Sequence, residues 1–118
     1  MSDKQFKALH RHARISARKA RPVADLVRGR PVNSALEELM ATHRRASPML
    51  QKVIRSAMAN AGQDLDVDVN RLYVSALRID EGPTLKRWRP RAQGRVYPIL
   101  KRSSHISVVL TEAPEEAD

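Results

Sequence analysis

The sequence has 118 residues, a formal net charge of +9 and no cysteine, which fits one domain in a reducing compartment. Aromatic residues make up only 3% of it, so its modest core must be aliphatic. Disulfides, thiolate zinc sites and cysteine nucleophiles are excluded, no apolar run is long enough to span a membrane, and the basic N-terminus lacks the apolar stretch of a secretory signal. We therefore expect a cytoplasmic, single-domain protein.

The first predicted helix covers residues 16–29. Ser16 can cap its start, and Gly29 can close it in a left-handed turn. Apolar side chains on one face would be Val23, Leu26 and Val27. Pro22 lies in the interior, where it removes a backbone hydrogen bond and costs about 3 kcal/mol. Either the first turn is separate, or the helix is kinked there.

Two further helices follow. In residues 31–43, apolar side chains recur at helical spacing, Ser34 and Glu37 stand in capping-box register, and Asn33 is an alternative cap. This stripe comprises Val32, Ala35, Leu36, Leu39 and Met40. The next helix is predicted to run from Ser47 as N-cap, with proline in the first turn, to Gly62. Its continuous apolar face predicts the long core helix: Met49, Leu50, Val53, Ile54, Ala57, Met58 and Ala61.

Residues 71–80 and 105–111 have the composition and alternation of half-buried strands. The connection between them exceeds twenty residues, which is long for a compact domain. It is functional, disordered, or a continuation of both strands into a hairpin that could reach about 30 Å from the core. The acidic tail at 113–118 is expected to be disordered.

Positive charge is concentrated in two blocks. Residues 1–30 contain nine Lys or Arg against two Asp, and residues 82–104 contain seven against no acidic residue. Residues 31–81 are nearly balanced, with six basic and seven acidic side chains. Separate blocks of one sign indicate a polyanionic partner, because phosphates relieve the repulsion and binding releases counterions. The alternative is a solvated basic surface that only keeps the protein soluble.

The second block, GPTLKRWRPRAQGRVYPILKRSS, has the chemistry of nucleic-acid recognition. Guanidinium groups pair with phosphates, and Trp88, the only tryptophan, can stack on a base or on an arginine. An irregular tip is expected near Pro90 to Gly94. In the first block, basic side chains near a helix N-terminus can act together with the helix dipole on a phosphate. Without a partner, the second block would be a loose basic loop.

The sequence gives little support for an enzymatic or metal-binding function. Asp64, Asp66 and Asp68 alternate as in a calcium loop, but the required Gly and final Glu are missing in either register. His10 and His12 lack a further ligand nearby in the sequence. We therefore predict no catalytic residues, no metal site and no cofactor.

Several segments together resemble a known family. These segments are RISARKAR, ADLVRG, SAMANA, EGPTLKRWRPRAQGR and KRSSHISVV, in that order. The chain is similar, from about Ala8 to Leu110, to bacterial large-subunit (50S) ribosomal proteins of the L-twenty-two family. The resemblance implies an α+β fold in which three helices pack on a three-stranded antiparallel sheet with a long protruding β-hairpin. It also implies that KALHRHARI is the first strand.

The resemblance further implies a structural protein that binds 23S rRNA early in subunit assembly, contacts neighbouring ribosomal proteins, and is not a homo-oligomer. The body would comprise about residues 8–80 and 100–112. The hairpin, about residues 81–99, would line the peptide exit tunnel, meet the nascent polypeptide and influence macrolide sensitivity. Expected rRNA-binding residues are Arg11, Arg14, Arg18, Lys19, Arg21, Lys86, Arg87, Trp88, Arg89, Arg91, Arg95, Lys101 and Arg102. The tip facing the tunnel would be Arg89, Pro90, Arg91, Ala92, Gln93 and Gly94.

Three features depart from the family pattern. Pro22 replaces a helix-compatible residue, Trp88 and Arg89 replace commonly aliphatic or methionine positions, and Pro98 is expected to interrupt strand pairing in the returning arm. None removes a basic residue. Two other functions stay open on the residues alone: an architectural DNA-binding protein, and an enzyme that acts on nucleic acid.

Overall fold

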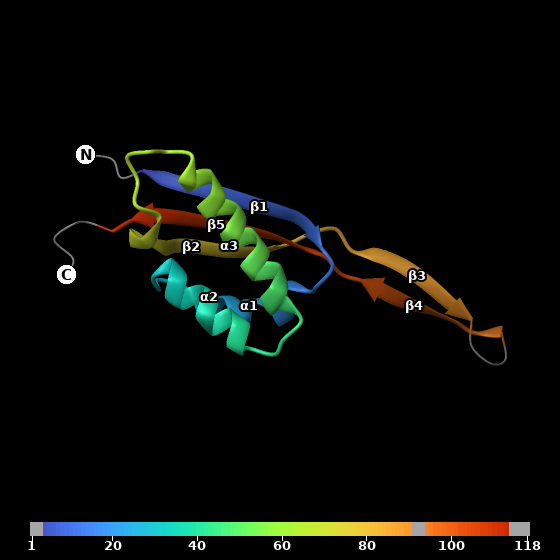
Figure 1. The fold of residues 1–118 in the computed structure, drawn as a ribbon. Coiled ribbons are helices and arrows are strands. Elements are labelled where there is room, and N and C mark those ends of the chain that lie inside the picture. Colours follow the sequence, from blue (N-terminus) through green and yellow to red (C-terminus); the bar gives the residue numbers. More distant parts are fainter. Residues whose placement is uncertain (1–3, 91–93, 114–118) are drawn as a thin grey trace.

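The computed structural model describes residues 4–90 and 94–113 (Figure 1). In chain order these residues form β1 (Gln5–Ala13), α1 (Ala17–Asp25), α2 (Val32–Ala41), α3 (Ala46–Gly62), a 3-10 turn (Val69–Arg71), β2 (Leu72–Glu81), β3 (Leu85–Pro90), β4 (Val96–Lys101) and β5 (Ser104–Glu112). An antiparallel sheet has the order β1-β5-β2, and β3 pairs with β4 in a separate hairpin. The predicted α+β fold is confirmed, including the first strand that the family resemblance implied.

Burial alternates along the sheet because one of its faces is covered and the other is open. In the central strand β5, alternate side chains are fully buried: Ile106, Val108 and Leu110. In β2 a bulge between Val74 and Ala76 shifts the alternation by one residue. β1 contributes only partly buried apolar side chains near its start, Phe6 and Ala8. This weak apolar pattern is why β1 could not be recognised from periodicity alone.

The long helix α3 lies across the sheet and packs on β1 and β5 (Figure 1). α2 packs against α3, and α1 packs against β2 and α3. The predicted apolar face of α3 is confirmed, with Met49 and Met58 at its half-buried edges. Along α2 the predicted stripe is correct except for Met40, which is 62% exposed.

The helix starts agree with the sequence only in part. Ser16 caps α1 as predicted, since its hydroxyl accepts a hydrogen bond from the Lys19 amide at 3.3 Å. The predicted capping box of α2 is wrong, because this helix already begins at Val32, before the expected caps. α3 begins one residue before Ser47, whose buried side chain packs inside the first turn rather than capping it. A proline at position 48 is still tolerated there, because first-turn amides have no partner within the helix.

Pro22 lies within a single helical segment, so the first turn of α1 is not a separate element. Proline has no amide hydrogen, so the helix lacks the hydrogen bond that residue 22 would donate to the carbonyl of Arg18. Burial of the opposite face against β2 offsets this loss, since Val23 and Ala24 are 1% and 0% exposed.

The long connection between β2 and β5 forms a hairpin that continues both strands, which was one of the three possibilities predicted from the sequence. β2 leads into β3 and β4 leads into β5, which gives the molecule extents of 68 × 25 × 19 Å (Figure 1). Pro98 does not interrupt β4, where it stands opposite Trp88 in the register. Every second residue of a two-stranded ribbon directs its amide away from the partner strand, and a proline can occupy such a position. The tail was expected to be disordered. Its residues after Ala113 lie outside the described ranges, so this stays a prediction.

Candidate nucleic-acid interface

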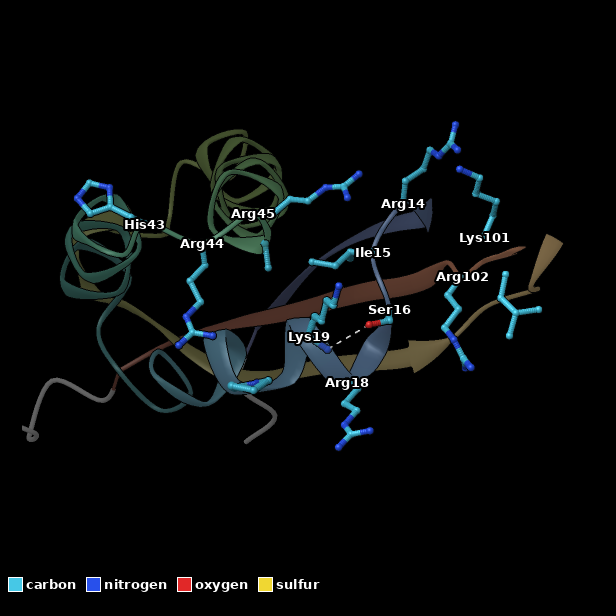
Figure 2. Close-up of a pocket in the computed structure, with 13 residues that line it drawn as sticks. Arg14, Ile15, Ser16, Arg18, Lys19, His43, Arg44, Arg45, Lys101 and Arg102 are labelled. Atoms are coloured by element: carbon cyan, nitrogen blue, oxygen red, sulfur yellow. Dashed lines mark hydrogen bonds between the residues drawn. The ribbon is translucent and has the colours of Figure 1, made fainter. Parts of the chain in front are cut away.

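A broad open groove of about 1200 Å³ lies where the hairpin leaves the body (Figure 2). Three separate segments line it: the junction of β1 and α1, the loop between α2 and α3, and the end of β4. Among the described residues that line it are seven basic side chains and no carboxylate: Arg14, Arg18, Lys19, Arg44, Arg45, Lys101 and Arg102. Groups of one charge gathered in a concave surface concentrate the electrostatic potential, which suits this groove to an anionic polymer.

The junction of β1 and α1 is held firmly beneath the groove. Ile15 is 5% exposed, and its carbonyl accepts a hydrogen bond from the Ser104 hydroxyl at 2.9 Å. The Ser16 cap then starts α1 and leaves Arg18 and Lys19 exposed in its first turn. The helix N-terminus adds its own partial positive charge to these side chains.

The loop between α2 and α3 contributes Arg44 and Arg45, which sequence reasoning did not select. Ala46 is 1% exposed and fixes the end of this loop against the core, so both arginines project at the groove (Figure 2). The run HRR at 43–45 was the available signal. This signal is weak, because the surrounding block of residues 31–81 is almost neutral.

The base of the hairpin is closed by contacts around Gly82. The Gly82 amide donates to the carbonyl of Ser103 at 3.0 Å, and the Ser103 hydroxyl donates to the carbonyl of Pro83 at 2.7 Å. A Cβ atom on Gly82 would stand 2.7 Å from that hydroxyl, so a larger residue there would force the Ser103 side chain to move. The contacts fix the direction in which Lys101 and Arg102 leave the sheet toward the groove.

Most predicted hairpin residues lie exposed on β3 and around the turn into β4. These are Lys86, Arg87, Trp88, Arg89, Pro90, Gly94 and Arg95. Gly94 has a φ of 72°, which agrees with the irregular tip expected there. Arg91, Ala92 and Gln93 lie outside the described residues, so their predicted roles stay predictions.

Besides the hairpin residues, two predicted rRNA-binding residues in the body are not part of the groove. Arg11 is exposed on β1. Arg21 is on α1, where its guanidinium donates to the carbonyl of Ile79 at 3.1 Å. This bond holds Arg21 against the edge of β2, which differs from the setting of the groove arginines.

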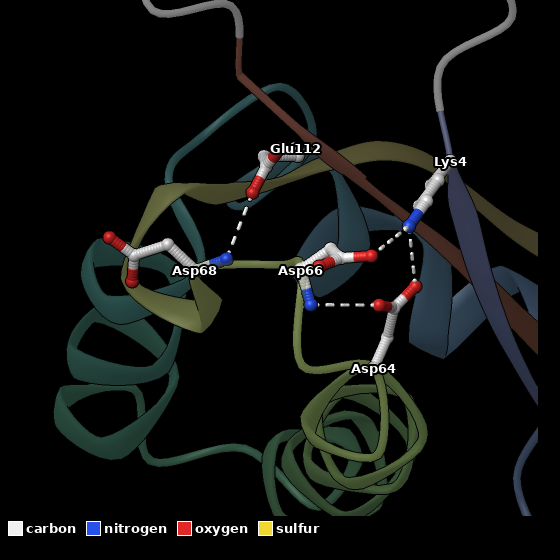
Figure 3. A network of polar contacts seen from close by, with 5 residues as sticks. All are labelled: Lys4, Asp64, Asp66, Asp68 and Glu112. Carbon is white, nitrogen blue, oxygen red and sulfur yellow. Dashed lines mark hydrogen bonds and ion pairs between the residues drawn. The ribbon is translucent and has the colours of Figure 1, made fainter.

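The aspartates considered above as a calcium loop do not converge on one point (Figure 3). Lys4 lies 2.9 Å from a carboxylate oxygen of Asp64 and 3.9 Å from one of Asp66. The backbone amide of Asp68 instead donates to Glu112 at 2.9 Å. The hydrogen bond from Lys4 holds the pKa of Asp64 below its usual value and raises the pKa of Lys4. This exposed pair therefore contributes to stability at neutral pH, and the contribution is lost as pH falls through the lowered pKa of Asp64.

Replacing Asp64, Asp66 and Asp68 together with asparagine should leave affinity for an rRNA fragment within about threefold of the parent value. The side chains lie outside the basic groove and serve to shape a turn, so their loss removes no contact with phosphate. Filter binding at fixed salt would measure this. A loss of more than about tenfold would mean that the carboxylates take part in RNA binding.

Among the described residues, no group of three or more His, Cys, Asp or Glu side chains could hold a metal ion. His12 instead packs edge-on against His105, with ring centroids 4.9 Å apart, and donates its amide to the Nδ1 of that ring at 3.2 Å. No helix in the described ranges is long and apolar enough to cross a membrane.

Comparison with known families agrees with this arrangement of a small body, a basic groove and a projecting hairpin. The model of the family described as ribosomal protein L22p/L17e matches residues 8–111, which include all the helices and strands but the first residues of β1 and the last of β5. The chain therefore belongs to the ribosomal protein L22p/L17e family, whose members are structural, rRNA-binding components of the large ribosomal subunit in the cytoplasm.

Proposed function

We propose that this chain binds 23S rRNA along one continuous basic surface, formed by the groove and the hairpin, and thereby supports assembly of the large subunit. The observation that carries the proposal is the continuity of this surface. Lys101 and Arg102, at the hairpin base, line the same groove as Arg18 and Arg45 from the body. An RNA backbone bound in the groove could therefore continue along the hairpin and remain in contact with basic side chains.

The groove supplies the electrostatic part of this binding. Arginine presents a planar fork that matches phosphate oxygens in a bidentate geometry. Within the described ranges, the ion pairs involve Lys4 and Arg28 and none of the groove residues, so the groove arginines keep their donors for a ligand. Lys19 and Lys101 add point charges beside them. The chemistry fits a structural role, in which phosphates are bound and no bond is made or broken.

The hairpin is proposed to pass through folded 23S rRNA and to line the peptide exit tunnel with its tip, residues 89–94. Its narrow, exposed ribbon has a net positive charge and suits a path between RNA segments, since a two-stranded hairpin alone in water is only marginally stable. The nascent polypeptide and neighbouring ribosomal proteins would be its further partners, with a single copy of the chain in each subunit. Residues 82–104 contain no Asp or Glu, so no carboxylate in this segment would repel the phosphates of the RNA.

The tunnel proposal is tested by a variant that lacks Lys86 to Val96 and closes the hairpin with a two-residue turn. The body has its own core and keeps the groove, so the variant should unfold at a similar temperature and retain binding to rRNA fragments. Large subunits that contain it should show altered macrolide response and altered contacts with nascent chains. The measurements are thermal unfolding, rRNA affinity, and crosslinking of a nascent peptide in purified ribosomes.

Retained folding, rRNA affinity and incorporation together with unchanged tunnel behaviour would contradict the tunnel role of the hairpin. A variant that folds but no longer enters large subunits would instead show that the hairpin is required for assembly. Either outcome concerns the hairpin alone, because the variant keeps the groove of the body.

A further inference from the structure

The pairing register gives the hairpin two chemically different faces. Side chains directly opposite each other on paired strands point to the same side, and successive residues alternate between sides. The pairs Lys86 with Leu100, Trp88 with Pro98, and Pro90 with Val96 therefore share one face. The other face carries Arg87, Arg89 and Lys101, together with Leu85 and Ile99. We call these the apolar face and the cationic face.

The apolar face is unusually exposed for its composition. Trp88 is 64% exposed, Val96 is 54% exposed and Leu100 is 43% exposed. In the described part of the chain, β3 and β4 form a sheet of only two strands, and neither the helices nor β1 covers it. An exposed apolar strip of this kind on a protein surface marks a binding site.

Charge identifies the class of ligand. The strip includes Lys86 on its own face, and the opposite face of the same ribbon carries Arg87 and Arg89. No Asp or Glu occurs between residues 82 and 104, so nothing in the hairpin attracts a basic partner. An exposed indole ring among cationic side chains is the combination with which proteins bind unpaired nucleotides: the bases stack on the ring and the phosphates meet the cations.

We propose that the apolar face is a stacking site for unpaired nucleobases, with Trp88 as the stacking ring, while the cationic face binds phosphates of RNA on the opposite side. The hairpin thus separates two RNA strands and uses different chemistry for each. This rests on the proposed binding of rRNA and adds to it a subsite that recognises bases.

The test uses the full chain and two probes of about twelve nucleotides: a single-stranded RNA, and the same chain with reduced abasic sugars in place of all nucleotides. The second probe keeps the phosphates and lacks the bases. Trp88 is the only tryptophan, so its fluorescence reports on the apolar face alone. We expect the RNA to quench this emission, and the abasic chain to bind without quenching it.

Matched variants then separate stacking from charge. Trp88→Leu keeps an apolar side chain without a stacking ring, and should weaken RNA binding by about 10- to 100-fold while abasic binding stays unchanged. Trp88→Phe keeps a smaller ring and should recover most of the lost affinity. The pair Arg87→Gln with Arg89→Gln should weaken both probes equally and lower the salt dependence of binding.

Equal binding of both probes by the parent chain and Trp88→Leu, without quenching, would overturn the stacking site. If the arginine variant still loses affinity in that case, rRNA binding stands and only the base-binding role of the apolar face fails. If neither variant changes binding, the proposed function of the hairpin fails as well. Concentration-dependent self-association that Trp88→Leu abolishes would also overturn the proposal, by making the apolar face a protein contact.

Discussion

Replacing Arg18, Arg45 and Arg102 together with glutamine is expected to weaken binding to a 23S rRNA fragment by about 100- to 500-fold at 0.1 M salt. The three arginines come from α1, the loop between α2 and α3, and the junction of β4 with β5, yet they line one groove. If each contacts one phosphate, each contact releases counterions that contribute about five- to eightfold in affinity at this salt. The slope of log affinity against log salt should become shallower by about 2 to 3.

A matched control changes the same net charge away from the groove, by replacing Lys7, Arg30 and Arg55 with glutamine. All three are exposed, and none lines the groove. We expect this control to lose less than about fivefold in affinity, through the general reduction in positive charge. Similar losses of affinity and similar salt slopes for the two triple variants would mean that RNA binding depends on net charge alone. The groove would then not be a specific binding site.

Replacing Leu50 with alanine should lower the free energy of unfolding by about 2 to 5 kcal/mol. Leu50 is fully buried on α3, in the core that joins this helix to the sheet and to α2. Removing its side chain loses the transfer free energy of the buried groups and leaves a cavity that the surrounding helices and strands fill only in part. Because small domains are stable by only about 5 to 15 kcal/mol, this is a large fraction of the total.

Denaturant unfolding of the free protein measures this effect, with Leu65→Ala as its control. Leu65 is 98% exposed in the turn after α3, so the same substitution there should change stability by less than about 0.5 kcal/mol. Equal effects at both positions would mean that α3 does not form the core described. The folded fraction of Leu50→Ala should still bind rRNA, because the groove side chains are unchanged.

The parts of the fold that could be predicted from the sequence are those with strong local periodicity. The apolar face of α3 and the alternation of Ile106, Val108 and Leu110 in β5 gave clear helix and strand signals. In β1, Phe6 and Ala8 are partly buried, Leu9 is exposed and only Ala13 at the end is buried, so its strand character followed from the family resemblance. The helix starts differ from the predicted ones because α2 and α3 begin at the buried residues Val32 and Ala46, before the local capping signals.

The candidate site was predicted in part. Basic residues near Ser16 and in the hairpin stood out because each lies in a block with a large excess of positive charge. Arg44 and Arg45 did not, since their role depends on where the loop between α2 and α3 lies in space. No local sequence pattern predicts that this loop lies beside the start of α1 and the end of β4. That meeting is produced by the packing of α3 on the sheet.

The most direct test of the account measures the affinity of the intact protein for a 23S rRNA fragment and for duplex DNA of equal length across a salt series. Both polymers carry phosphates, so both should bind more weakly as salt rises. We expect rRNA to bind at least about 100-fold more tightly throughout the series, and the protein to enter large subunits. Equal affinity for the two polymers, with no entry into subunits, would contradict it and favour an architectural DNA-binding protein.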